Sequence, residues 1–195
     1  MNGAKQEETK SSGTIEAGAE PCLLEADAGG IRTLTLNRPR QFNALSDSLL
    51  SALEKALAAA AADRNIHVVV LAGAGKAFCA GHDLKEMRTH GDPAFPSQAF
   101  AAMSRVMQAL TALPQPVIAR VHGMAYAAGC QIVAQCDLAV AAEEATFATS
   151  GINFGLFCST PGVALSRNIP RKQAFEMLVT GEPINAATAL ARGLV

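Results

Sequence analysis

The chain has 195 residues, half of them hydrophobic and only 5% aromatic, so a single domain with a mainly aliphatic core is expected. Sixteen basic and seventeen acidic residues give a net charge of −1, which argues against a partner held by charge, such as nucleic acid. The five cysteines are odd in number and form no CxxC pair, a pattern typical of buried free thiols in a reducing compartment.

The first 20 residues are polar and contain no apolar segment of the kind found in signal peptides. We therefore predict a flexible tail over residues 1–20 and a folded domain over residues 21–195. Because the tail is not the arginine-rich, acid-poor type, we expect a cytoplasmic protein; the alternative is the mitochondrial matrix, if a transit peptide has been removed. Polar side chains interrupt the most apolar stretch, residues 117–142, so no membrane span is expected.

Hydrophobic periodicity predicts alternating strands and helices. Alternating apolar residues indicate a strand over Ile31–Leu36, Ser46 caps a helix that runs to about Ala62, and the apolar run Val68–Leu71 indicates a strand buried on both faces. Later in the chain we predict a helix over 83–87, a loop over 93–96, helices over 97–113, 128–136, 161–169, 172–180 and 186–191, a strand over 116–121 and a buried strand over 137–141. This alternation predicts an α/β fold.

Two glycine-containing turns, each opening a helix, are the strongest functional signal. The first is Phe78–Asp83 and the second is His122–Gln131. The first backbone N–H groups of a helix have no partner within the helix and lie at the positive end of its dipole. Two such ends directed at one point can bind a carbonyl oxygen and stabilise the negative charge that grows on it during thioester chemistry.

With these turns, the chain resembles the crotonase (enoyl-CoA hydratase/isomerase) superfamily from about Pro21 onward. The resemblance rests on motifs that occur together in the family's order. They are Leu36–Pro39, Asn43–Leu45, Ala77–Met87, Pro116–Ala119 with Gly123, Gly129–Cys130, Cys136–Asp137 and Thr180–Ile184. Within the superfamily, Ala127–Gln131 and Phe154–Leu165 are similar to the enoyl-CoA hydratase domain-containing protein 3 group.

The resemblance implies a crotonase-like spiral of ββα turns that binds acyl-CoA thioesters in fatty acid metabolism, with coenzyme A as part of the substrate and no separate cofactor or metal. It places the two oxyanion-hole N–H groups on Ala80 and Ala128. It also implies a homotrimer or hexamer in the full-length family form, completed by helices beyond the position of Val195. We therefore expect the C-terminal helical part to be missing and assembly of this form to be weak.

The sequence departs from the family at the two catalytic glutamates, which fall on Gln131 and Gly151. An amide cannot take a proton from water near neutral pH, and glycine has no side chain. Gln131 has two interpretations, a group that orients water and a polar side chain satisfied within the core. His82 is a further catalytic candidate because imidazole titrates near neutrality; the alternative is a helix-terminal residue that faces solvent.

The remaining candidates are assigned to substrate binding. Arg38, Arg40 and Lys85 suit the phosphates of CoA, although each is also an ordinary surface charge. The full predicted binding set is Arg38, Arg40, Phe42, Ala44, Phe78, Ala80, His82, Asp83, Leu84, Lys85, Tyr126, Ala128 and Gly155. Two functions fit these residues, an enoyl-CoA hydratase of low activity and an acyl-CoA-binding or regulatory protein with little or no turnover.

Overall fold

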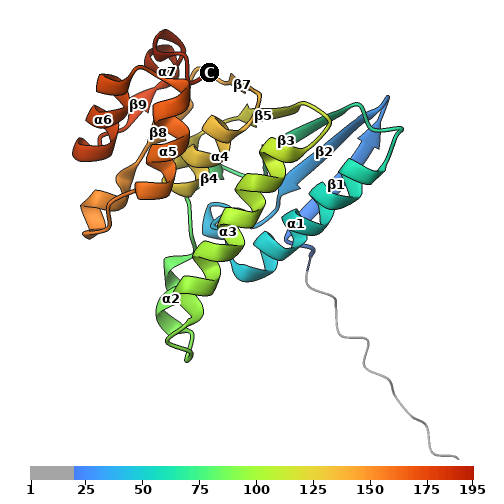
Figure 1. The fold of residues 1–195 in the computed structure, drawn as a ribbon, viewed down its shortest axis with the longest axis horizontal. Helices are drawn as coiled ribbons and strands as arrows, with labels where there is room; N and C mark the ends of the chain where they lie inside the picture. The colour runs from blue at the N-terminus through green and yellow to red at the C-terminus, as the bar shows by residue number, and fades with distance from the viewer. Residues whose placement is uncertain (1–19) are drawn as a thin grey trace, which may run out of the picture.

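The described part of the chain is residues 20–195 of a computed structural model, so the predicted tail falls outside it except for its last residue. Figure 1 shows an α/β arrangement in which α1 and α3 run side by side across one face of a twisted sheet. The helices α5, α6 and α7 gather at the other end of the molecule. No helix of this described part is both long and apolar enough to cross a membrane.

The larger sheet has five strands in the order β1-β2-β3-β5-β7. Its first two strands form an antiparallel hairpin in which Leu23 lies opposite Leu36, and the other neighbours run parallel. The strands are β1 (Leu23–Ala28), β2 (Ile31–Leu36), β3 (Val68–Gly73), β5 (Val117–Val121) and β7 (Leu138–Ala141). The predicted strands over 31–36, 68–71 and 116–121 are confirmed.

A second sheet of four short strands lies in the order β4-β6-β8-β9. The strands are β4 (Ala77–Cys79), β6 (Met124–Tyr126), β8 (Thr146–Ala148) and β9 (Ile184–Asn185). Each of β4, β6 and β8 follows a strand of the larger sheet and precedes a helical segment. The chain thus repeats a strand–strand–helix unit, and the predicted crotonase-like spiral of ββα turns is confirmed.

Helices connect the repeats. They are η1 (Pro39–Gln41), α1 (Asp47–Ala62), α2 (Leu84–Thr89), α3 (Phe95–Ala112), α4 (Ala128–Gln135), η2 (Ser150–Phe154), α5 (Ser159–Asn168), α6 (Arg171–Thr180) and α7 (Ala186–Arg192). Ser46 caps α1 as predicted, because its hydroxyl accepts the Leu49 N–H at 3.3 Å. The apolar face of α1, which includes Leu50, Leu53 and Leu57, is buried in the core.

Two local predictions are wrong. The segment 93–96 is not a loop throughout, because α3 begins at Phe95 and Pro96 occupies its first turn, where no intrahelical N–H is required. The strand over 137–141 is not buried, because β7 is the edge of the larger sheet, and Leu138 and Val140 are 60% and 65% exposed. All five cysteines are free and four of them are buried.

Candidate functional site

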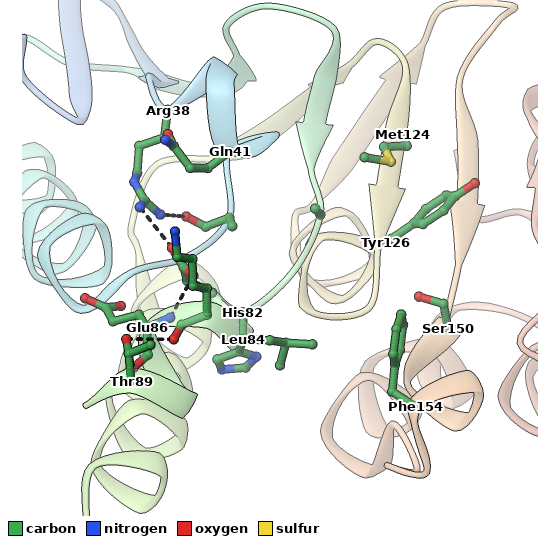
Figure 2. A pocket seen from close by; sticks show the side chains of 14 residues that line it. Arg38, Gln41, His82, Leu84, Glu86, Thr89, Met124, Tyr126, Ser150 and Phe154 are labelled. Atoms are coloured by element: carbon green, nitrogen blue, oxygen red, sulfur yellow. Dashed lines mark hydrogen bonds and ion pairs between the residues drawn. The ribbon is translucent and has the colours of Figure 1, made fainter. Parts of the chain in front are cut away.

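A cleft of about 690 Å³ lies where the first turn, β6 and η2 approach one another. Figure 2 shows Arg38, His82 and Glu86 on one side of it and Tyr126, Ser150 and Phe154 on the other. The cleft brings together many of the predicted binding residues, namely Arg38, Ala44, Ala80, His82, Asp83, Leu84, Lys85 and Tyr126. It is completed by residues that were not predicted, namely Gln41, Glu86, Thr89, Met124, Ser150 and Phe154.

Several predicted binding residues do not line the cleft. Phe78 is fully buried in the core. Arg40, Phe42 and Gly155 are exposed away from the lining, and Ala128 is buried with 2% of its surface exposed. Phe42 still bears on the site, because its backbone carbonyl contacts the first turn.

In the first turn, the backbone N–H of His82 points away from the neighbouring segment around Leu45, to which the rest of the turn is hydrogen-bonded. Leu45 donates its N–H to the Gly81 carbonyl at 2.8 Å and accepts the Asp83 N–H at 3.1 Å. In a trans peptide the C=O of one residue and the N–H of the next point in opposite directions. The Gly81 carbonyl points at Leu45, so the His82 N–H points away from it, and no partner for this N–H exists within residues 20–195.

The expected donor on Ala80 is already in use. Its N–H donates to the Phe42 carbonyl at 3.0 Å, because the loop that follows η1 folds against β4 and covers it. An N–H engaged in this way cannot also bind a substrate oxygen at full strength. The prediction is therefore corrected, and the donor without a partner in the first turn is the N–H of His82.

The second turn contributes Ala128 as the first residue of α4, where an N–H has no intrahelical acceptor. The described residues supply no other acceptor for it. Ala127 before it has φ 48° and ψ −116°, a conformation that L-residues rarely adopt and that stores about 1–3 kcal/mol of strain. Strain of this size is typical of functional turns.

The two turns touch at Gly81. Its φ of +98° favours glycine, and a Cβ there would lie 3.1 Å from the Tyr126 carbonyl oxygen and 3.3 Å from the Ala128 nitrogen. Only a residue without a side chain fits this position without displacing the second turn. The turn that carries the His82 N–H and the turn that carries the Ala128 N–H are therefore packed closely together at Gly81.

The His82 side chain packs against Phe100, with ring centroids 4.7 Å apart and the rings tilted by 51°. Its Nε2 is buried and has no hydrogen-bond partner among the described residues. Burial lowers the pKa of His82 to about 4, so the imidazole is neutral at neutral pH. At that pH the imidazole therefore has no proton to donate as a general acid.

The two positions of the family glutamates lie outside the cleft lining. Gln131 is 6% exposed, and its buried Oε1 has no partner in the described part of the chain. Gly151 is crowded, since a Cβ there would lie 2.4 Å from the Leu156 carbonyl oxygen and 2.7 Å from Cys158 Sγ. Burial raises the pKa of the Cys158 thiol, so this group does not take over as a base.

The charged side chains of the cleft differ in whether they are already bonded to other groups of the protein. Arg38 donates Nη2 to Asp83 Oδ2 at 2.9 Å and Nη1 to the Ala44 carbonyl, so its guanidinium is occupied. Burial opposes ionisation of Asp83, but hydrogen bonds from the Glu86 N–H and from Arg38 hold its pKa below the usual value. Lys85 is exposed and forms no ion pair with any described residue, which leaves it free for an anionic ligand.

The chain is similar to known proteins over most of its length. The family model described as enoyl-CoA hydratase/isomerase matches residues 26–195. Enoyl-CoA hydratase domain-containing protein 3, mitochondrial, from Xenopus laevis is 49% identical over 175 residues, which are 90% of this chain and 60% of that protein. The protein of the same name from Danio rerio is 47% identical over 172 residues, covering 88% of this chain and 60% of that protein. The chain thus spans about 60% of the length of these relatives.

Solved structures agree with these similarities. An enoyl-CoA hydratase from Mycobacterium smegmatis superposes with a TM-score of 0.87 at 61% identity, covering 90% of this chain and 69% of that one. Human enoyl-CoA hydratase domain-containing protein 3 superposes with a TM-score of 0.86 at 45% identity, covering 89% and 69%.

Proposed function

Because the chain belongs to the enoyl-CoA hydratase/isomerase family, we propose that it binds an acyl-CoA thioester in this cleft and polarises the thioester carbonyl. The oxygen lies between the N–H groups of His82 and Ala128. One observation carries the proposal: these two N–H groups have no partner among the described residues, and they lie on two turns that touch at Gly81. Donors fixed in this way before the ligand arrives need no reorganisation when charge develops on the oxygen.

Other residues of the cleft suit the phosphates of CoA at one end of such a ligand and its acyl group at the other end. The free ammonium of Lys85 suits a phosphate of CoA. The side chains of Met124, Tyr126 and Phe154 give an apolar wall for the acyl group on the opposite side. The mitochondrial names of the curated relatives support the mitochondrial matrix over the cytoplasm for this chain.

Hydration of an enoyl-CoA is the reaction in the names of the relatives, and we propose that this chain performs it slowly. Water addition needs a base for the water and an acid for the α carbon, and Gln131 and Gly151 supply neither. One such group contributes a factor of about 10²–10⁴ in rate. The alternative, an acyl-CoA-binding or regulatory protein with little or no turnover, is favoured by the crowding at Gly151, which leaves no space for a carboxylate.

The test measures binding and turnover on one preparation. Calorimetry with crotonyl-CoA and with CoA reports whether the acyl thioester adds affinity, and a crotonyl-CoA hydration assay reports turnover beside a hydratase that has both glutamates. We expect a clear preference for the thioester and hydration slower by at least about 10²-fold. Equal affinity for CoA would exclude the proposed oxygen site, and hydration at the reference rate would point to an unrecognised base.

A further inference from the structure

The segment from Asn37 to Asp47, here called the supporting loop, is hydrogen-bonded to the first turn along its length. Within that turn it accepts the N–H groups of Ala80 and Asp83 and donates to the carbonyl of Gly81. Beyond the turn, the Asp47 N–H donates to Glu86 Oε2 at 3.0 Å. The His82 N–H is the group that this network leaves free.

The buried side-chain amide of Asn43 holds the supporting loop against the segment that leads into the first turn. Asn43 is fully buried, and its Nδ2 donates to the carbonyls of Ala77 at 2.7 Å and Ala74 at 2.9 Å. Its Oδ1 accepts the backbone N–H of Arg38 at 2.9 Å. The backbone from which the Arg38 side chain starts is therefore fixed relative to β4, which leads into the first turn.

A chain of hydrogen bonds runs from the Arg38 guanidinium to the free donor through two peptide groups. Arg38 Nη1 donates to the Ala44 carbonyl, and the N–H of the same peptide, on Leu45, donates to the Gly81 carbonyl at 2.8 Å. The N–H of that second peptide is the one on His82. In each trans peptide the carbonyl and the N–H point in opposite directions, so the relay is continuous.

We propose that Arg38 is a positioning residue for the oxyanion hole, which fixes and polarises the His82 N–H through the Ala44–Leu45 and Gly81–His82 peptides. Hydrogen bonds in such a chain polarise one another, which strengthens each of them by about 10–30%. The positive charge of Arg38 directs this polarisation towards the His82 N–H. Asp83 completes the arrangement, because its Oδ2 holds the other guanidinium nitrogen at 2.9 Å. This inference rests on the proposed function and assigns Arg38 a task other than direct contact with CoA phosphates.

The burial of the Arg38–Asp83 pair supports this task. The two side chains are only 20% and 12% exposed, whereas the Arg105–Glu54 pair between α3 and α1 is 55% and 40% exposed. An arginine is required because its planar fork reaches two acceptors at once, and a lysine ammonium cannot reproduce that geometry. Arg38→Lys therefore keeps the charge and removes the fork, and Arg38→Met removes both.

The experiment uses a bound chromophore on the 195-residue chain. The probe is a cinnamoyl-CoA with an electron-donating ring substituent, whose absorption moves to longer wavelength when its thioester carbonyl is polarised. We would measure this red shift, and the dissociation constants of the probe and of CoA, for wild type, Arg38→Met, Arg38→Lys and Asp83→Asn. Arg105→Met is the matched control, because it removes an ion pair of similar length, 3.0 Å, on the outer face of α3.

We expect Arg38→Met to lose part of the red shift and to bind the probe roughly two- to fourfold more weakly, because the His82 donor is weakened while the Ala128 donor remains, with CoA affinity nearly unchanged. Arg38→Lys and Asp83→Asn should show smaller losses, and Arg105→Met none. A full red shift in Arg38→Met overturns the inference, as does equal weakening of probe and CoA, which would make Arg38 a phosphate ligand. Should Arg38→Met fail to fold, Arg38→Lys decides, since a wild-type red shift there overturns the inference equally. A wild type that binds the probe without any red shift overturns the proposed function as well.

Discussion

One side of the site has the two backbone donors, whereas the other side lacks both of the carboxylates that the family has there. On the donor side, two N–H groups without partners among residues 20–195 sit on turns that touch, and a hydrogen-bonded loop fixes the first of them. On the side where the family places its glutamates, the buried oxygen of Gln131 has no partner in the same part of the chain, and Gly151 is crowded by Leu156 and Cys158. The two N–H donors and the positions of the family glutamates are thus separate parts of this architecture.

The two parts are separate because one consists of backbone groups and the other of side chains. The donors are backbone groups, so they persist as long as the turns keep their shape, whatever side chains they carry. Proton transfer depends on individual carboxylates, and one substitution removes each of them. The following experiments test whether the two parts are as independent as the structure implies.

The largest effect is expected from removal of the second donor. Ala128→Pro deletes an N–H that no helix carbonyl uses, at the first residue of α4. Loss of one oxyanion donor costs about 10²–10³-fold, so affinity for an enolate-like CoA analogue should fall by a factor of this order. Titration calorimetry with the analogue and with CoA measures the effect.

The matched control for Ala128→Pro is Ala186→Pro, the same change at the first residue of α7. It should leave both affinities at their wild-type values. If Ala128→Pro, still folded by thermal melting, kept full affinity for the analogue, the donor side would not be the binding side and the comparison would fail.

A second experiment adds a carboxylate where space allows. Gln131→Glu restores one of the two family glutamates at a residue whose side chain is already accommodated. Crotonyl-CoA hydration should rise by about 10²-fold, the lower end of the contribution of one acid–base group, because the second glutamate is still missing. Gln135→Glu, one helical turn further along α4, serves as control and should not raise the rate. An unchanged rate in Gln131→Glu would mean that the donor side is not aligned with this position.

The third experiment tests the crowding at Gly151. Gly151→Glu should destabilise the fold by about 1–3 kcal/mol, as overpacking does, because its Cβ meets a backbone oxygen at 2.4 Å. Gly91→Glu is the control, since a Cβ at Gly91 meets no atom within 4 Å. Urea unfolding of the two variants gives the difference. Equal stability would show that this side of the cleft rearranges easily and is not closed to a second carboxylate.

The last experiment concerns pH and the buried imidazole of His82. Burial lowers the pKa of His82 to about 4, whereas an unfolded histidine titrates near 6.5. Between these values the unfolded chain binds the proton and the folded chain does not, so stability falls as pH drops, by up to about 1.4 kcal/mol per pH unit. Above the unfolded pKa the contribution is complete and constant.

Unfolding free energies of wild type and His82→Gln between about pH 7 and pH 4 measure this contribution. The wild type should lose more stability than the variant as pH falls, while His67→Gln, at an exposed histidine, should follow the wild type. Parallel curves for wild type and His82→Gln would show that the imidazole is hydrated and not sealed against Phe100.

Much of the fold could be predicted because its signals are local. The strand at Ile31–Leu36 follows from alternation, and the cap at Ser46 follows from residue type next to an apolar helical pattern. The short strands of the second sheet have no such signal, since three residues beside a glycine turn carry no periodicity. The exposure of β7 was missed because an apolar run looks alike at the centre and at the edge of a sheet.

The first turn could be located from its spacing and residue types. The choice between Ala80 and His82 as the available donor could not, because it depends on the Phe42 carbonyl, which comes from a distant part of the chain. The occupation of Arg38 by Asp83 also depends on tertiary structure, across 45 positions of sequence. Ser150 and Phe154, which line the cleft, lie in η2 and carry no signal of a binding role before the fold is known.

The alternation of used and unused N–H groups along the first turn has a consequence for hydrogen exchange. The amide protons of Ala80 and Asp83 are held by carbonyl acceptors and should exchange slowly with solvent deuterium. The amide proton of His82, between them, is held by no acceptor in the described part of the chain and belongs to a residue that lines the cleft. In the free protein this one amide should stand out as fast between slow neighbours. A bound thioester oxygen would slow it selectively, so the exchange rate of a single proton reports on occupancy of the site without any turnover.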